Sequence, residues 1–371
     1  MTLFTSRFFF WRQFDWILIT VVFILSFIGL AAMYSVDLSR GQVESFFGTQ
    51  IIAFFLGVIV MIIASMQHAS AYRISARLMF ILAIVLLVLV LLIGVTVRGT
   101  TGWFRLAGFS FQPVEFAKVV FILFLAWWAD KYKRRFYSWH FVVSSALFTF
   151  LPMILVFLQP DFGSAIIFAS LWFGILIIAK TRLRYLFSVI GVGVGVLVIG
   201  WFFLFAPYQK ERLLTFIQPE REPLGAGYNV TQSIIAVGAG QWIGRGLGFG
   251  SQSQLHFLPE AQTDFIFAVI GEELGFVGAV VVLALYLLLF WRLLRLALLS
   301  ENDFSSFAIL SVVLLFFVQT AINIGATLGL LPVTGVTLPF ISAGGSSLLM
   351  NFFLIGIVQS LGRSARLQKI D

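Results

Sequence analysis

The chain has 371 residues, of which 60% are hydrophobic and 11% are charged, and its formal net charge is +8. This composition excludes an ordinary soluble globular protein, because repeated apolar runs of about twenty residues are typical of membrane-spanning helices. In a membrane protein a basic balance reflects cytoplasmic loops more often than nucleic-acid binding, so no nucleic-acid partner is expected. The chain contains no cysteine, which excludes disulfides, thiol nucleophiles and cysteine-ligated metals.

Hydropathy predicts an all-α integral membrane protein in which residues 1–371 form a single polytopic domain. Ten candidate transmembrane helices occur in chain order, at about 16–35, 49–66, 78–97, 113–129, 139–157, 163–180, 184–206, 264–291, 305–325 and 338–361. The short connections between them are alternately basic and non-basic, and most Lys and Arg residues fall on one side. By the positive-inside rule, both termini are predicted to be cytoplasmic.

The connection of residues 207–263, between the seventh and eighth spans, is long and is predicted to be extracytoplasmic. A loop of this length in a compact protein is usually functional or disordered. Aromatic and aliphatic side chains such as Tyr228 and Trp242 occur along it. We therefore expect the loop to be at least partly ordered against the membrane surface.

The stretch 258–275, LPEAQTDFIFAVIGEELG, places acidic residues in or beside the eighth apolar run. An acid in such a run is costly to bury, so a functional role is the default hypothesis. Asp264 stands at the start of the span, where the alternative role is a helix N-cap. Glu272 follows eight residues later, which at about 100° per residue returns it to within about 80° of the same face, whereas Glu273 faces nearly the opposite way. We therefore expect Asp264 and Glu272 to share a polar cavity.

Two more acids occur at predicted helix starts on the same, outer side. Glu115 and Lys118 have i, i+3 spacing on one helix face, so they form either a structural ion pair or a pair that binds substrate. Asp161 lies in QPDFGSA, where it either caps the sixth span or belongs to the site. Helix N-termini on this side also favour anions.

Several cations on the predicted outer side are candidates for binding a phosphate group. They are Arg98, Arg105, Lys118, Lys210, Arg212 and Arg245. The stretch 331–347, LPVTGVTLPFISAGGSS, adds Ser346 as a candidate substrate-binding residue. The glycine N–H groups of this stretch could cradle phosphate oxygens, or its small residues could allow close helix packing. No His-based zinc site or Walker loop is visible, so no cofactor is assigned, and a divalent cation held by the acids is the alternative.

Five stretches of the chain resemble the SEDS family (shape, elongation, division and sporulation), the group of RodA and FtsW. They are QPVEFAK at 112–118, QPDFGSA at 159–165, GAGYNVTQSIIAVGAG at 225–240, LPEAQTDFIFAVIGEELG at 258–275 and INIGATLGLLPVTGVTLPFISAGGSS at 322–347. Together with ten spans and a large loop after the seventh, the resemblance covers nearly the whole chain. GFGSQSQL and LLPVTGV are more similar to RodA and VTLPFIS to FtsW, and we favour the elongation type.

The resemblance implies a glycosyltransferase that polymerises lipid II, a disaccharide-pentapeptide on undecaprenyl diphosphate, at the outer face of the bacterial cytoplasmic membrane. The essential Asp of the family corresponds to Asp264, and Glu115 and Lys118 match its QPSE…K motif. The implied partners are lipid II, a class B penicillin-binding protein and membrane lipids. Two other functions are considered: a flippase for a lipid-linked precursor, and a non-enzymatic scaffold in which the acids are structural.

Overall fold

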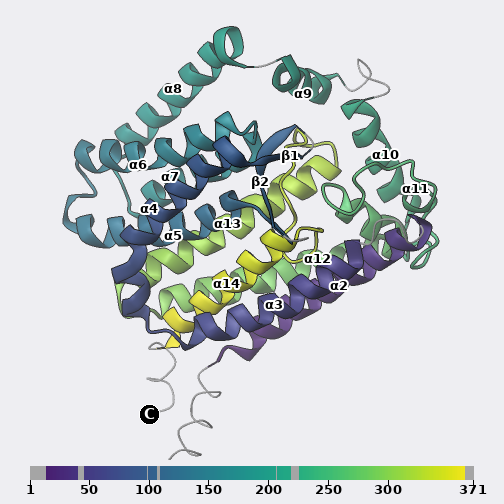
Figure 1. Ribbon diagram of the computed structural model, residues 1–371, viewed down its shortest axis with the longest axis horizontal. Coiled ribbons are helices and arrows are strands. Elements are labelled where there is room, and N and C mark those ends of the chain that lie inside the picture. Colours follow the sequence, from purple (N-terminus) through teal and green to yellow (C-terminus); the bar gives the residue numbers. More distant parts are fainter. Residues whose placement is uncertain are drawn as a thin grey trace, which may run out of the picture.

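The computed structural model describes residues 14–40, 46–97, 99–106, 109–205, 207–218 and 225–363, and it shows a bundle of long helices (Figure 1). Among the described residues, seven helices are long and apolar enough to span a membrane. These are α2 (Trp16–Arg40), α3 (Phe46–Met66), α4 (Ala69–Ile93), α6 (Trp139–Leu158), α8 (Leu183–Ile199), α12 (Ile266–Leu298) and α13 (Asp303–Thr327). The prediction of a mainly helical, multi-pass membrane protein is confirmed.

Three other helices of the bundle are α5 (Pro113–Tyr132), α7 (Phe162–Ile178) and α14 (Gly345–Leu361). Side chains on nearly every face of α5 and α14 are buried, which is typical of a helix surrounded by other helices. α5 packs against α4 and α13, and α14 packs against α3. These two helices therefore form the centre of the fold.

Helix α8 has the opposite environment. None of its side chains, all of which lie in the described part of the chain, is buried. In Figure 1, α8 lies at the outer edge of the bundle. Because lipid tails are as apolar as its Leu, Ile and Val side chains, such a helix fits direct contact with lipid along its length.

Polar residues placed just before the helices set several of the helix starts. Asp15 caps α2, Ser138 caps α6, Asp161 caps α7 and Asn302 caps α13. Each side chain accepts a hydrogen bond from the backbone N–H three residues later, at 3.0, 3.4, 2.9 and 2.7 Å respectively. Helix α5 begins instead with Pro113, whose fixed φ suits the first helical turn.

A three-stranded antiparallel sheet between α4 and α5 was not predicted. Its strands, in the order β1-β2-β3, are β1 (Val95–Val97), β2 (Thr100–Leu106) and β3 (Phe109–Phe111). The predicted third span ran to residue 97, whereas α4 ends at Ile93. The change follows from the run Val95, Thr96 and Val97, whose β-branched side chains favour a strand. Gly99, with φ of +81°, then allows the turn into β2.

The connection of residues 207–263 is partly helical. It contains α9 (Pro207–Ile217), α10 (Ala226–Ala239) and α11 (Ser251–Gln254). Helix α10 packs against α12 and α13, and the Ser233 hydroxyl donates to the Thr327 carbonyl at 2.7 Å. In Figure 1, α10 and α11 cover one end of the bundle. The expectation of a partly ordered connection is met in this part of the chain.

The longest described helix, α12, is interrupted at Gly275, where φ is +66° and ψ is −164°. Segment 241–246 lies against the break and supplies backbone hydrogen bonds that the helix loses there. The four bonds are Arg245 N to Glu272 O (3.0 Å), Gly246 N to Glu273 O (2.9 Å), Phe276 N to Gln241 O (2.8 Å) and Val277 N to Trp242 O (3.1 Å). A Cβ at Gly275 would lie 2.2 Å from the Gly244 nitrogen, so glycine is required by both conformation and space.

Candidate functional site

A cavity of about 970 Å³ lies where α5, α7 and α14 begin. This volume is at the upper end of the range usual for ligand sites. Its walls come from the sheet, the starts of α3, α5, α7 and α14, helices α9 and α10, and segments 260–265 and 329–347. Its ionisable lining residues, among those described, are Arg105, Glu115, Lys118, Asp161, Glu260 and Asp264. Five residues singled out from the sequence, Arg105, Glu115, Lys118, Asp161 and Asp264, therefore meet in one cavity.

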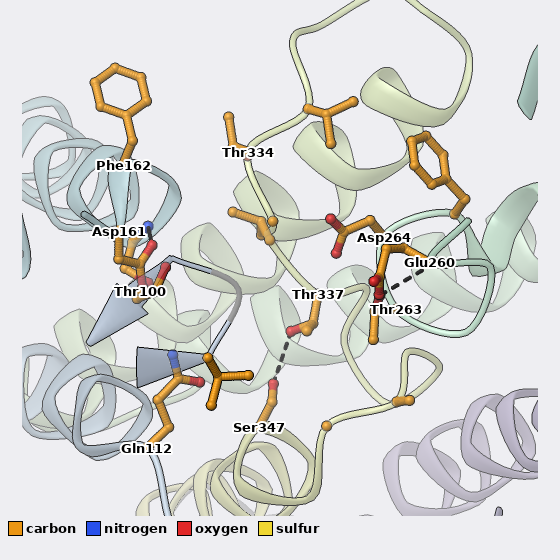
Figure 2. Close-up of a pocket in the computed structure, with 18 of the residues that line it drawn as sticks. Thr100, Gln112, Asp161, Phe162, Glu260, Thr263, Asp264, Thr334, Thr337 and Ser347 are labelled. Carbon is orange, nitrogen blue, oxygen red and sulfur yellow. Dashed lines mark hydrogen bonds between the residues drawn. The ribbon is translucent and has the colours of Figure 1, made fainter. Parts of the chain in front are cut away.

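Asp264 projects into this cavity from the segment that precedes α12 (Figure 2). Helix α12 begins at Ile266 with Phe265 at its N-cap position, so Asp264 does not take the N-cap position. Beside it, the Thr263 hydroxyl donates to Glu260 Oε2 at 3.0 Å. The carboxylates of Glu260 and Asp264, both half-buried, thus lie on the same wall of the cavity.

Asp161 lies across the cavity from Asp264 (Figure 2). Its Oδ1 accepts a hydrogen bond from the Ser164 backbone N–H at 2.9 Å, which makes it the N-cap of α7. Asp161 is therefore the N-cap of α7, and it also lines the cavity.

Glu115 and Lys118 form an ion pair on the first turns of α5. Lys118 Nζ lies 2.8 Å from Glu115 Oε1. The Lys118 side chain is only 4% exposed and the Glu115 side chain 9%. Both residues line the cavity. A buried pair of this kind is costly to separate, because the remaining charge would be left uncompensated. The pair is thus both a structural element of α5 and part of the cavity wall.

The N-termini of α5, α7 and α14 face the same cavity. It is lined by Gln112 and Glu115 at the start of α5, Phe162 and Ser164 of α7, and Gly345 and Ser347 of α14. Each N-terminus carries the positive end of a helix dipole. Together with Lys118 and Arg105, these helix ends form a region of cationic groups and helix dipoles, beside the carboxylates of Glu115 and Asp161. Such a region favours a phosphate or diphosphate group.

Glu272 does not line this cavity, which corrects the expectation that it shares a cavity with Asp264. It is fully buried and accepts hydrogen bonds from the loop around α11. The donors are Gln252 N (2.8 Å), Ser253 N (3.2 Å) and Ser251 Oγ (3.4 Å). The extrapolation of 100° per residue from Asp264 does not apply, because the helix begins only at Ile266. Glu273 points elsewhere, to the Ser35 hydroxyl and the Gly248 N–H.

The predicted cations are only partly gathered here. Arg245 is exposed and does not line the cavity; its guanidinium donates to Ser251 Oγ at 2.8 Å and to the Ala239 carbonyl at 3.3 Å. Arg98 lies outside the described residues, and for Arg212 only the position in α9 is described. Lys118 and Arg105 are the cations that line the described cavity.

The stretch after α13 contributes to the cavity, although Ser346 itself does not line it. Ser346 Oγ accepts from the Gln112 N–H at 3.1 Å and donates to the Ser110 carbonyl at 2.9 Å, which ties α14 to the start of α5. Its neighbour Ser347 lines the cavity and shares a hydrogen bond with Thr337 at 3.0 Å (Figure 2).

Gln50 of α3 lines the cavity and was not predicted from the sequence. Its side chain is buried, accepts from the Gly344 N–H at 3.1 Å and donates to the Ser342 carbonyl at 3.2 Å. A lone Gln within the apolar run of α3 was the available signal, because a polar group at membrane depth needs protein partners. As for the divalent cation, no three His, Cys, Asp or Glu side chains are grouped as possible metal ligands within the described ranges.

Comparisons with known proteins identify the family. The profile described as "Cell cycle protein", which covers FtsW, RodA and SpoVE, matches residues 14–367. The chain therefore belongs to the FtsW/RodA/SpoVE family. It is 33% identical over 368 residues to "Probable peptidoglycan glycosyltransferase FtsW" of Trichlorobacter lovleyi, covering 96% of this chain and 94% of that protein. It is 37% identical over 306 residues to "Peptidoglycan glycosyltransferase MrdB" of Escherichia coli (strain K12), covering 82% of each.

Other relatives widen this picture. "Stage V sporulation protein E" of Bacillus subtilis is 34% identical over 360 residues, covering 95% of this chain and 98% of that protein. The crystal structure of the rod shape determining protein RodA of Thermus thermophilus matches with a TM-score of 0.71 at 27% identity, covering 95% and 97% of the two chains. A chain from a structure described as "Structural coordination of polymerization and crosslinking by a peptidoglycan synthase complex" matches with a TM-score of 0.80 at 29% identity, covering 95% and 98%. Relatives named FtsW and MrdB match at similar identities, so these values do not single out the elongation type.

Proposed function

We propose that this protein is a peptidoglycan glycosyltransferase that polymerises lipid II at the cavity around Asp264. Family membership supports the reaction class, since relatives over most of the chain are named peptidoglycan glycosyltransferases. The observation that carries the assignment of the site is the meeting of Asp264 with three helix N-termini and two cations in one cavity of about 970 Å³. A carboxylate can take a proton there, while the cationic groups and helix N-termini receive a diphosphate.

In the proposed reaction Asp264 accepts the proton of the acceptor sugar's 4-hydroxyl. The hydroxyl oxygen forms a bond to the anomeric carbon of the donor sugar, and the bond from that carbon to the diphosphate oxygen breaks. Undecaprenyl diphosphate leaves with the bonding electron pair. Negative charge grows on the diphosphate in the transition state, so donors and cations already in place stabilise it most. The helix starts of α5, α7 and α14 and the side chains of Lys118 and Arg105 are positioned to do this.

We also propose a topology of ten membrane-spanning helices, with α5, α7 and α14 joining the seven apolar spans. The connection of residues 207–263 between α8 and α12 would be extracytoplasmic and both termini cytoplasmic, in the bacterial cytoplasmic membrane. The alternation of basic and non-basic connections supports this arrangement. It places the cavity on the outer face, where lipid II must be used after its transport.

A class B penicillin-binding protein is the proposed partner. The similarity to a chain of a peptidoglycan synthase complex supports it, because that complex combines polymerisation with crosslinking. Adding a purified class B penicillin-binding protein should raise the rate of lipid II polymerisation by this chain. The proposal fails if the two proteins neither associate in detergent nor change each other's activity.

The function is tested by polymerisation of lipid II with purified protein. Asp264→Asn should lower the turnover rate about 10²–10⁴-fold, the usual contribution of a general base, while the protein stays folded. The matched control is Asp303→Asn, because Asp303 is a half-exposed carboxylate in the first turn of α13 whose pair with Lys133 lies at the surface. Normal polymerisation by Asp264→Asn would overturn the assignment of the base.

A further inference from the structure

The proposed base lies on a segment without regular secondary structure. Residues 259–265 form successive turns before α12, and Asp264 is one of them. A catalytic group must nevertheless be held close to one geometry, since a displacement of about 1 Å can lower a rate roughly 10²-fold. Something outside this segment must therefore fix its backbone.

Three consecutive carbonyl groups of this segment accept hydrogen bonds from α13 and from the region between α13 and α14. The Ala343 N–H donates to the Gln262 carbonyl at 2.8 Å. The Ser342 hydroxyl donates to the Thr263 carbonyl at 2.7 Å, and the Asn323 side-chain amide donates to the Asp264 carbonyl at 3.1 Å. Fixing three successive carbonyls restricts the peptide planes on both sides of the Asp264 Cα atom, and hence the direction in which its carboxylate leaves the backbone.

Asn323 is well suited to this task. It is 2% exposed on α13, and its Nδ2 donates both to the Asp264 carbonyl and to the Val336 carbonyl, the latter at 2.9 Å. An amide nitrogen has two hydrogens, so the geometry uses both donors. Asp264 and Val336 both line the cavity. Asn323 thus joins two walls of the cavity to one buried helix.

Ser342 makes a second connection. Its hydroxyl donates to the Thr263 carbonyl and accepts a hydrogen bond from the Leu338 N–H at 2.9 Å. The residue is 4% exposed. Because its donor and an acceptor site are both used, loss of the hydroxyl leaves a buried carbonyl and a buried N–H without this partner.

We propose that Asn323 and Ser342 are positioning residues that hold the backbone of residues 262–264 so that the Asp264 carboxylate points at the acceptor hydroxyl. This inference rests on the proposed role of Asp264 as the base. Neither side chain needs to touch substrate. Their effect should fall on the chemical step, with substrate binding largely kept.

The test compares isosteric and conservative variants. Asn323→Asp keeps the shape of the side chain but replaces Nδ2 by an oxygen atom that faces the Asp264 and Val336 carbonyl oxygens. Ser342→Ala removes one hydroxyl. Ser342→Thr keeps a hydroxyl and serves as the rescue. The matched control is Ser311→Ala. Ser311 lies on α13, as Asn323 does, and is fully buried. Its hydroxyl donates to the Phe307 carbonyl at 2.8 Å, a bond within α13 itself.

Each variant is purified, checked for monodispersity and thermal unfolding, and assayed for kcat and KM with lipid II. We expect Asn323→Asp and Ser342→Ala to lower kcat about 10- to 100-fold with KM nearly unchanged, Ser342→Thr to recover most of kcat, and Ser311→Ala to match wild type. If Asn323→Asp does not fold, the comparison of Ser342→Ala with Ser342→Thr tests the proposal. The proposal would be overturned if folded Ser342→Ala kept the wild-type kcat. It would also be overturned if kcat fell only in proportion to the loss of folded protein in every variant, including Ser311→Ala.

Asp264→Asn is assayed in parallel to separate this inference from the proposed function. If Asp264→Asn is active, the base assignment fails and the positioning role fails with it. If Asp264→Asn is inactive while folded Asn323→Asp and Ser342→Ala keep wild-type kcat, the positioning role alone is refuted.

Discussion

Replacing Glu272 by Gln separates two roles for this acid, a substrate ligand or a support for the loop around α11. Glu272 is fully buried, and its two carboxylate oxygens accept from the backbone N–H groups of Gln252 and Ser253. Glu272→Gln keeps one carbonyl oxygen but turns an NH₂ group toward one of these donors. A hydrogen bond to a charged group contributes about 1.5–3 kcal/mol, so the loop should lose about that much local stability.

That loss predicts about 10- to 150-fold faster hydrogen exchange for the Gln252 and Ser253 amides, since every 1.4 kcal/mol is a factor of ten. Exchange measured by mass spectrometry on purified protein would report it, with Glu301→Gln at an exposed position as the control. KM for lipid II should stay unchanged, because Glu272 does not line the cavity. Unchanged exchange together with a raised KM would refute this reasoning and restore Glu272 as a substrate ligand.

Three further predictions concern stability, measured by unfolding in detergent and by hydrogen exchange. Tyr286→Phe removes a buried hydroxyl that donates to a carbonyl before α14 at 2.6 Å, so it should cost about 1–3 kcal/mol. Gly244→Ala places a Cβ 2.1 Å from the Glu273 carbonyl oxygen at a φ of +79°, so exchange should rise in segment 241–249; unchanged exchange would contradict the fit described here. Lys118→Met leaves the Glu115 carboxylate buried without its partner, so the free energy of unfolding should fall by about 3–5 kcal/mol. The double variant Lys118→Met/Glu115→Gln should lose less. Equal losses in the two variants would show that the pair is not coupled.

The helices of the bundle were predictable from the sequence because apolar runs and polar caps act locally. Asp161 and Asn302 precede their helices in the sequence and cap them in the structure. The sheet was missed because Val95, Thr96 and Val97 continue the apolar run of α4, and hydropathy does not distinguish a strand from a helix in so short a stretch. β-branching was the signal that favoured the strand.

Three of the acids that line the cavity, Glu115, Asp161 and Asp264, were singled out from the sequence, but their arrangement required the fold. Asp264 and Asp161 were identified as outer-side acids, and the structure places them across one cavity. Glu272 was misplaced because the true start of α12 depends on the turns that precede it. The contacts of Asn323 join residues far apart in the chain, and a periodicity argument along one helix carries no information about them.

The burial of α5 on nearly all sides has a consequence for how the protein is made. This helix carries Glu115 and Lys118 near its start and is not among the seven described helices that are long and apolar enough to span a membrane. Its main neighbours are α4, already synthesised when α5 emerges, and α13, which comes much later. In the proposed ten-span topology, stable membrane insertion of α5 would therefore depend on a helix that the ribosome has not yet made. A chain that ends after α8 should leave α5 poorly inserted and open to degradation.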